Sequence, residues 1–250
     1  METLKESVVI ITGGSSGIGR ATALSFASRG ARVLITGRRP ASLDETAKNQ
    51  PNIKTLVADT AEPDGGPRTI ARAIELWGRL DVLVNNAGAG AIMPLAEVTA
   101  RRILDIFAVN VLGPSLLAKE ALPHLKETRG SIINISSTYG SKAGAALSHY
   151  GASKAALEYL TRSWALELAP IRIRVNAVAV GPTETGALEG MMRLSKQQAA
   201  IVKQGEREQI PLGRRGTPDD VSRWIVSLAE PASNWITGQV LAVDGGLSLT

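Results

Sequence analysis

Short runs of apolar residues alternate along this chain with longer segments in which apolar positions recur at helical spacing. The short runs are rich in Val, Ile and Leu, as expected of strands that are buried on both faces. They predict strands over 7–12, 31–36, 53–58, 81–84, 130–135, 171–178 and 239–243. The longer segments predict helices over 17–28, 41–48, 67–77, 99–125, 150–168 and 218–229.

This alternation predicts an α/β fold, a doubly wound parallel sheet of about seven strands with helices on both faces. No repeat, low-complexity tract or linker interrupts the pattern, so we expect residues 1–250 to form a single domain. Ligands of such sheets bind at the carboxyl ends of the strands. The segment 186–209, between the sixth strand and the last helix, is rich in polar helix formers. We interpret it as a mobile helical lid over the site; an ordinary surface insertion is the alternative.

The composition removes several classes of chemistry. A chain of 250 residues buries enough surface to fold without a metal or a disulfide. It has no Cys, which excludes disulfides, Cys-ligated zinc or iron–sulfur sites and thiol nucleophiles. Two His are too few for a typical His-built zinc site, and no carboxylate motif points to Mg²⁺ or Ca²⁺, so we predict no metal site.

The net charge of +5 is spread along the chain, with Arg38-Arg39 and Arg214-Arg215 as small clusters. No helix-turn-helix or RNA-binding signature accompanies these charges, so we predict no nucleic-acid partner. The N-terminus lacks the pattern of a signal peptide. No apolar run approaches the roughly 18 residues of a membrane span. We therefore expect no membrane association and a cytoplasmic location.

A glycine-rich turn, Thr12-Gly13-Gly14-Ser15-Ser16-Gly17-Ile18-Gly19, joins the first predicted strand to the first predicted helix. Its glycines allow a tight turn, close approach of the backbone to a pyrophosphate and close helix–strand packing. The helix N-terminus adds free N–H groups and the positive end of the helix dipole. The spacing G-x-x-x-G-x-G differs from the common G-x-G-x-x-G fingerprint, and no Lys follows as in a P-loop. The turn is a candidate phosphate site; a turn without a ligand is the alternative.

The second predicted strand ends in Leu34-Ile35-Thr36-Gly37-Arg38-Arg39. Sites for NAD often place a carboxylate here for the ribose 2′-hydroxyl, whereas an Arg accommodates the 2′-phosphate of NADP. We predict NADP(H) as the preferred cofactor, with Arg38 as the main contact and Arg39 as the second, and NAD(H) as the alternative cofactor. A pair of solvated arginines is the other interpretation.

Tyr150 and Lys154 stand four residues apart at the start of a predicted helix, so they share one helix face. A phenol with a pKa near 10 is a poor base at neutral pH, but a nearby ammonium favours the phenolate. We expect Lys154, together with a cationic nicotinamide, to lower the pKa of Tyr150. The strand over 130–135 brings Ser136 and Ser137 to a carboxyl end, where a hydroxyl can orient a substrate oxygen near the phenol.

Together with Asn85-Asn86-Ala87-Gly88, Asn110 and the ending Val243-Asp244-Gly245-Gly246, these motifs resemble the short-chain dehydrogenase/reductase family over nearly the whole chain. Short stretches are similar to bacterial 3-oxoacyl carrier-protein reductases and related carbonyl reductases. The resemblance implies a Rossmann-type fold and an oxidoreductase that transfers hydride between nicotinamide and a carbonyl or secondary alcohol. It also implies a homotetramer.

The resemblance assigns roles by position. It implies that Tyr150 is the general acid/base, that Lys154 lowers the Tyr150 pKa and binds the nicotinamide ribose, and that Ser137 orients the substrate. Asn110 would support a water-mediated proton relay with Lys154, and Asp59 would contact adenine. The predicted cofactor-binding set is Gly13, Ser15, Ser16, Gly17, Ile18, Gly19, Arg38, Arg39, Asp59, Asn86, Ala87, Gly88, Tyr150, Lys154, Gly181, Thr183 and Thr185.

One position departs from the family pattern. Val180 stands where the family commonly has Pro before Gly181, so we expect a less rigid cofactor loop and a less secure role for Thr185. Pro182 restores part of the stiffness by fixing its own φ.

The substrate is indicated only by class. Small residues over 87–91, the run Ala145-Ala146-Leu147 and the pair Met191-Met192 predict a roomy, mainly apolar pocket, and no residue specifies an anionic handle. We expect a small-molecule substrate, either a hydrophobic ketone or a β-keto compound. Two alternatives remain: an NAD-dependent alcohol dehydrogenase of the same family, and a dinucleotide-binding protein without turnover.

Overall fold

The computed structural model describes residues 4–250 and confirms the predicted parallel sheet. The strands are β1 (Val8–Thr12), β2 (Arg32–Gly37), β3 (Ile53–Val57), β4 (Val82–Asn85), β5 (Ser131–Ser137), β6 (Arg174–Val180) and β7 (Val240–Val243). They lie in the order β3-β2-β1-β4-β5-β6-β7, and each neighbouring pair is parallel. The strand order reverses between β1 and β4, which is the switch point where doubly wound sheets bind ligands.

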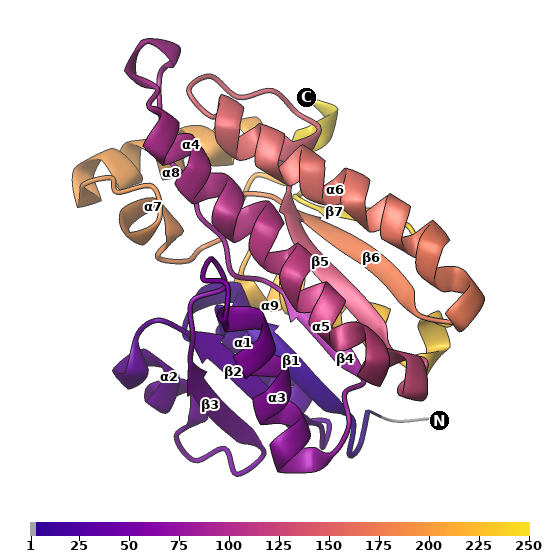
Figure 1. Ribbon diagram of the computed structural model, residues 1–250. Coiled ribbons are helices and arrows are strands. Elements are labelled where there is room, and N and C mark those ends of the chain that lie inside the picture. The colour runs from indigo at the N-terminus through magenta and orange to yellow at the C-terminus, as the bar shows by residue number, and fades with distance from the viewer. Residues whose placement is uncertain (1–3) are drawn as a thin grey trace.

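Helices cover both faces of this sheet (Figure 1). They are α1 (Gly17–Ala27), α2 (Pro40–Ala47), α3 (Gly65–Trp77), α4 (Ala100–Phe107), α5 (Gly113–Thr128), α6 (Ser148–Leu168), α7 (Ala187–Gly190), α8 (Lys196–Gln209) and α9 (Pro218–Ala229). Buried residues of α1, α2 and α9 pack on one face. Buried residues of α3, α5 and α6 pack on the other.

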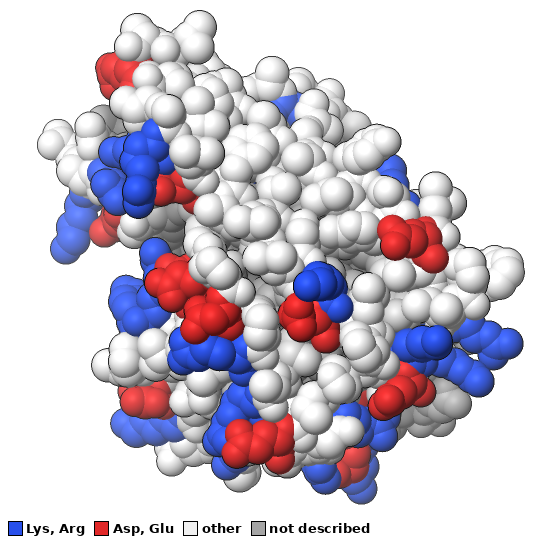
Figure 2. All heavy atoms as spheres, viewed as in Figure 1, with Lys and Arg blue, Asp and Glu red and all other residues white. Residues whose placement is uncertain are grey.

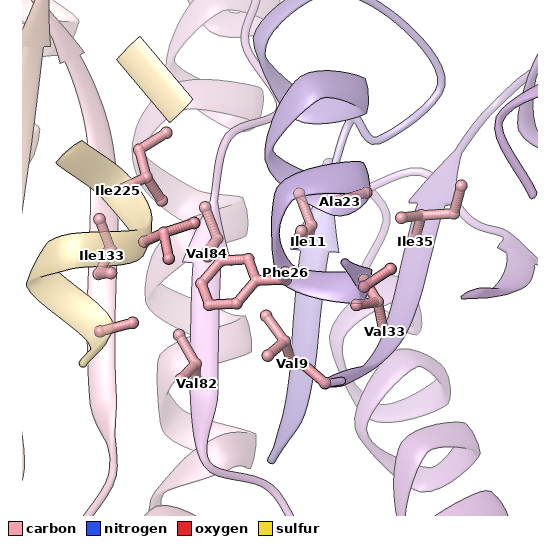
Figure 3. Packing of buried hydrophobic residues seen from close by; sticks show 14 of the residues in the cluster. Val9, Ile11, Ala23, Phe26, Val33, Ile35, Val82, Val84, Ile133 and Ile225 are labelled. Carbon is pink, nitrogen blue, oxygen red and sulfur yellow. The ribbon is translucent and has the colours of Figure 1, made fainter. Parts of the chain in front are cut away.

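Because helices cover both faces, the strands are apolar on both sides. In β1, Val9 and Ile11 belong to the buried cluster beneath α1 and α9, whereas Val8 and Ile10 belong to the cluster beneath α3, α5 and α6. Figure 3 shows the ring of Phe26, from α1, lying over the residues of β1 and β4. Burying a side chain of this size contributes about 1.5–3 kcal/mol. This core fixes the strand ends at which the candidate site lies.

The helix predicted over 99–125 is in fact two helices, α4 and α5, joined by a π-turn over Ala108–Leu112. The N–H of Gly113 donates to the carbonyl of Ala108, five residues earlier instead of the usual four. A side chain at Gly113 would collide with the Thr60 carbonyl oxygen, which lies 2.5 Å from the position of its Cβ. Asn110 stands at the centre of the turn. Apolar periodicity does not distinguish this local widening from a continuous helix.

Other boundaries differ from the prediction at polar residues. β5 continues through Ser136 and Ser137, beyond the predicted end at 135, because both stay in register with β6. β6 begins at Arg174 instead of 171, because Ala169–Ile171 forms a turn of 3₁₀ helix. The segment 186–209 contains α7 and α8.

Candidate active site

A cavity of about 650 Å³ opens at the carboxyl edge of the sheet. Its wall takes residues from the turns after β1, β2, β3, β4, β5 and β6, and from α6, α7 and α8. The structure brings together on this wall all of the predicted site residues except Asn110. They are Gly13, Ser15, Ser16, Gly17, Ile18, Gly19, Arg38, Arg39, Asp59, Asn86, Ala87, Gly88, Ser137, Tyr150, Lys154, Gly181, Thr183 and Thr185.

The glycine turn after β1 has the backbone geometry of an anion site. Gly13 and Gly17 adopt φ values of +67° and +53°, which side chains other than glycine rarely allow. A Cβ on Gly19 would lie 2.5 Å from Nδ2 of Asn86 and closer still to the carbonyl oxygen of Gly13. Ser16 caps α1 without a side-chain hydrogen bond. The first N–H groups of α1 therefore have no acceptor in their own helix, and the cradle fits a phosphate.

Asn86 and Thr12 tie the glycine turn to the turn after β4. The Asn86 Nδ2 donates to the carbonyls of Thr12, at 2.8 Å, and Gly13, at 3.2 Å. The Thr12 hydroxyl accepts from the backbone N–H groups of Asn86, at 3.0 Å, and Ala87, at 2.9 Å. These hydrogen bonds fix the turn after β1 against the turn after β4, at the switch point of the sheet.

Two guanidinium groups stand at the end of β2. Arg38 is exposed and its Nη1 lies 3.8 Å from Oδ2 of Asp59, which follows β3. Arg39 caps the start of α2 and is also exposed. Both arginines border the same cavity as the glycine turn, so they can reach the end of an extended dinucleotide.

Tyr150 and Lys154 lie on α6, beside Ser137 at the end of β5. The Lys154 Nζ donates a 2.8 Å hydrogen bond to the carbonyl of Ile135 and lies 6.0 Å from the centre of the Tyr150 ring. Burial lowers the pKa of Lys154 to about 8, although the charge of Glu158 acts in the opposite direction.

The lowering of the Tyr150 pKa that we expect from Lys154 together with a cationic nicotinamide concerns the site with cofactor bound, and it stays a prediction. In the chain alone, burial of the phenol raises this pKa, while the hydrogen bond with Ser137 acts to lower it. The neutral phenol avoids the cost of placing a charge in an apolar environment. Tyr150 is therefore a phenol, not a phenolate, at neutral pH.

Asn110 lies behind the wall of the cavity and is fully buried. Its Oδ1 accepts from the N–H of Ala89, at 2.8 Å, and its Nδ2 donates to the Ala89 carbonyl, also at 2.8 Å. The Nδ2 is also 2.9 Å from the Ser153 hydroxyl, which in turn donates to the carbonyl of Tyr150. The amide thus links the turn after β4 to the first turn of α6, which carries Tyr150.

An ion cluster centred on the buried Arg215, beside the cavity, was not predicted from the sequence. Arg215 is 5% exposed and pairs with Glu206 of α8 and with Glu184, whose Oε1 is 3.2 Å from its Nε. Lys203 and Arg207, also from α8, lie 3.0 and 3.1 Å from the oxygens of Glu184. The sequence showed Arg214-Arg215 only as a charged pair, because the burial of one of them depends on where α8 packs.

Arg215 of this cluster also contacts the loop after β6, and so does the next residue, Gly216. The Arg215 Nη2 donates to the carbonyl of Thr183 at 2.6 Å. Gly216 accepts from the N–H of Glu184 at 2.8 Å and donates to the carbonyl of Pro182 at 2.9 Å. Val180, the position that departs from the family pattern, is the last residue of β6 and pairs with both neighbouring strands. These contacts link the loop to Arg215, Gly216 and the neighbouring strands, and its lower rigidity stays a prediction.

Two features are absent from residues 4–250. In this part of the chain, no group of three or more His, Asp or Glu is arranged to hold a metal ion. Within the same range, no helix has the length and apolar character that crossing a membrane requires.

Comparison with known proteins agrees with this geometry. Residues 13–248 match the family model described as Enoyl-(Acyl carrier protein) reductase. The 3-oxoacyl-[acyl-carrier-protein] reductase of Thermotoga maritima is 35% identical over 249 residues, which cover 98% of each chain. A short-chain dehydrogenase/reductase of unknown function from Caenorhabditis elegans, solved with cofactor, superposes with a TM-score of 0.92 at 35% identity, covering 99% of this chain and 97% of the other.

A third comparison gives the same result. The 3-ketoacyl-(acyl-carrier-protein) reductase of Brucella melitensis, solved with NADH, superposes with a TM-score of 0.91 at 32% identity, covering 98% of this chain and all of that one. A glycine turn, a Tyr–Lys pair on one helix and a seven-stranded parallel sheet thus occur in a chain whose relatives match it from end to end. The chain belongs to the short-chain dehydrogenase/reductase family of oxidoreductases.

Proposed function

We propose that this protein is an NADP(H)-dependent carbonyl reductase in which residues 1–250 act as one dinucleotide-binding and catalytic domain. One observation carries the proposal. The half-buried phenol of Tyr150, with Ser137 and Lys154 beside it, shares a cavity of about 650 Å³ with the glycine turn. A proton donor and a dinucleotide cradle in one cavity are what the reduction of a carbonyl requires.

The chain would hold the cofactor along the carboxyl edge of the sheet. The N–H groups at the start of α1 would bind the pyrophosphate, Asp59 would face the adenine, and Lys154 would bind the nicotinamide ribose. The loop with Thr183 and Thr185 would close over the nicotinamide. When bound, the nicotinamide supplies or accepts the hydride.

Tyr150 would exchange the proton. Its raised pKa keeps the phenol protonated at neutral pH, so it can donate to the oxygen of a carbonyl that accepts hydride. The Ser137 hydroxyl would hold that oxygen beside the phenol. Lys154, with a pKa of about 8, is mainly an ammonium at neutral pH and would stabilise the phenolate that remains. Asn110 would keep the turn at Ala89 in place behind this pair and support the proton relay.

The preference for NADP(H) rests on Arg38 and Arg39. A 2′-phosphate paired with Arg38 should favour NADPH over NADH by about 1.5–3 kcal/mol, roughly ten- to a hundredfold in the dissociation constant. The carboxylate of Asp59, 3.8 Å from Arg38, favours the alternative in which NAD(H) is used, because it already offsets part of the guanidinium charge. The relative from Brucella melitensis was solved with NADH.

The cavity favours an apolar substrate with a polar end. Ala89, Leu188, Met191 and Met192 supply apolar lining near the reactive groups. We expect a hydrophobic ketone or a β-keto compound, which is also the class that the 3-oxoacyl relative from Thermotoga maritima is named for. Residues 186–209 would act as the lid over this end, opening for substrate exchange.

We also propose a homotetramer. Exposed apolar side chains lie on the α4–α5 segment, at Leu104 and Leu112, and on α6, at Leu166. Figure 2 shows that the surface over α6 carries few charged side chains. Light scattering on the intact chain tests this assembly: a mass of one subunit contradicts it. The cytoplasmic location stays a prediction.

Replacement of Tyr150 by Phe tests the catalytic role. We expect Tyr150→Phe to lower NADPH-dependent reduction of a β-keto ester such as ethyl acetoacetate by about 10²–10⁴-fold. The dissociation constant of NADPH, measured by calorimetry, should stay unchanged. Tyr159→Phe is the matched control, because this phenol lies on the same helix and is exposed. Full activity of Tyr150→Phe would remove Tyr150 from the mechanism, and binding without turnover by the wild type would favour the non-catalytic alternative.

Calorimetry with NADPH and NADH at one salt concentration tests the cofactor preference. We expect NADPH to bind more tightly, and Arg38→Asp to abolish the difference. A ratio of affinities that Arg38→Asp does not change would mean that Arg38 is not the residue that discriminates between the two cofactors.

A further inference from the structure

Glu158 is a buried carboxylate that the proposed mechanism does not use. Tyr150, Lys154 and Glu158 follow one another at intervals of four residues on α6, so they share the face that looks onto β5. Only 5% of Glu158 is exposed. A carboxylate is rarely buried to this extent unless it is paired, because burial without a partner is costly. Its partners therefore indicate its role.

On one side, Glu158 holds the turn that leaves β5. Its Oε1 accepts a 2.8 Å hydrogen bond from the hydroxyl of Ser136, the residue before Ser137. Gly140 provides the space, because a Cβ at that position would overlap Oε1. Arg162, one turn further along α6, brings its Nη2 to 4.0 Å from Oε2, but its side chain is more than half exposed. The inward contacts of the carboxylate thus lie on the segment that carries Ser137.

On the other side, Glu158 is one helical turn from Lys154. The Lys154 ammonium donates to the carbonyl of Ile135, which carries no net charge. The titratable groups that face Lys154 from its own helix are Tyr150 and Glu158. The π-turn contributes the neutral amide of Asn110, whose Oδ1 and the Lys154 Nζ each lie 3.7 Å from the position of a Cβ on Gly88. Glu158 is therefore the source of negative charge beside this buried lysine.

A buried ammonium without negative charge nearby readily loses its proton. Burial already lowers the pKa of Lys154 to about 8, and Glu158 acts against that change. Removing the carboxylate would therefore lower the pKa further, toward neutral pH.

We propose that Glu158 is a positioning residue of this site, the built-in counter-charge that keeps Lys154 in its ammonium form while the same carboxylate anchors the turn from Ser136 to Gly140. The effect of Glu158 on turnover rests on the proposed function. Its effect on the protonation of Lys154 does not.

A direct titration of Lys154 tests the inference without a substrate. In protein labelled with ¹³C-lysine, the Cε resonance of Lys154 is assigned by its loss in Lys154→Met and followed against pH by NMR. We expect a midpoint near 8 in the wild type. In Glu158→Gln, which keeps an oxygen acceptor for Ser136, we expect the midpoint to fall by about 1 pH unit. The alkaline limb of kcat/KM for ethyl acetoacetate should move to lower pH by the same amount.

Two control variants separate charge from packing. Glu167→Gln removes the same charge from an exposed position of α6, about 20 Å along the helix from Lys154, and should leave the midpoint unchanged. Ser136→Ala removes the hydrogen bond but keeps the charge, and should leave the midpoint close to that of the wild type. If Glu158→Gln does not fold, Glu158→Asp, which withdraws the carboxylate by one methylene, should give a smaller shift in the same direction.

Different results would contradict the role of Glu158 and the proposed function. A midpoint that does not move in a folded Glu158 variant, or that moves equally in Glu167→Gln, would overturn the role of Glu158. A midpoint that moves as expected in a protein that reduces no carbonyl would support this role and contradict the proposed function.

Discussion

Substitution of Gly19 by Ala should disable the dinucleotide cradle. The added Cβ would lie 2.5 Å from Nδ2 of Asn86, 2.9 Å from the carbonyl carbon of Gly13 and closer still to that carbonyl's oxygen, whereas real Cβ atoms essentially never approach within 3.0 Å. The obstacle is mainly backbone, so the turn must move by about half an ångström or more, and overpacking of this kind costs about 1–3 kcal/mol. For a chain of this size that corresponds to a fall in Tm of about 2–4 °C per kcal/mol.

The effect on binding should be larger than the effect on stability. A movement of this size stretches hydrogen bonds from the turn beyond their normal length of about 2.9 Å. Each lost hydrogen bond to a charged phosphate costs about 1.5–3 kcal/mol, or roughly ten- to a hundredfold in the dissociation constant. Calorimetric titration with NADPH measures this loss, and thermal unfolding measures the change in stability.

Gly205→Ala is the matched control. Gly205 lies inside α8, and no atom lies within 4 Å of the position of its Cβ. Ala should stabilise this helix by about 0.5–1 kcal/mol and leave NADPH binding unchanged. If Gly19→Ala bound NADPH as tightly as the wild type, the glycine turn would not be the phosphate site.

Three further substitutions, with Arg101→Met as a control, test the core, the buried lysine and the ion cluster. Phe26→Ala should lower the free energy of unfolding by about 3–5 kcal/mol in urea, because the ring is fully buried; a loss below 1 kcal/mol would contradict the packing described. The pKa of Lys154, about 8 against an ordinary 10.5, means that between these pH values the unfolded chain binds the extra proton. Raising the pH through this range should therefore stabilise the wild type by up to about 3 kcal/mol relative to Lys154→Met, in urea unfolding at pH 7.5 and 10. Arg215→Met should cost about 1.5–3 kcal/mol, because Glu206 and the carbonyl of Thr183 lose a charged partner, whereas Glu184 keeps Lys203 and Arg207. Arg101→Met, in an exposed pair on α4, should cost less than about 0.5 kcal/mol, and equal losses of Tm would contradict the difference.

Features that depend on residues close together in the sequence were predicted from it. The apolar runs located every strand of the sheet, because strands covered on both faces need continuous apolar sequence. The glycine turn and the Tyr150–Lys154 pair were found because each depends on spacing within a single element. The end of β5 was missed because Ser136 and Ser137 are polar, although their backbone continues the ladder.

Features that depend on packing were not predicted. The burial of Arg215 follows from how α8 packs, which brings Glu206 of that helix and Glu184 of the loop after β6 to the same guanidinium. The effect of burial on the pKa of Tyr150 depends on how the chain packs around the phenol. The sequence showed a cation nearby, but it did not show how much solvent the fold removes. The role of Glu158 was not predicted either. The sequence shows it as a polar residue on a helix, but it does not show which residues the carboxylate contacts.

The π-turn over Ala108–Leu112 fixes the number of residues that can lie between α4 and α5. A π-turn contains one residue more than the α-helical turn that it replaces. Deleting one residue between Phe107 and Gly113 would restore a continuous helix, and the parts on either side would rotate by about 100° and shift by about 1.5 Å relative to each other. Asn110 would then turn away from Ala89, and Gly113 would leave the Thr60 carbonyl. During evolution, this stretch should therefore accept neither insertions nor deletions.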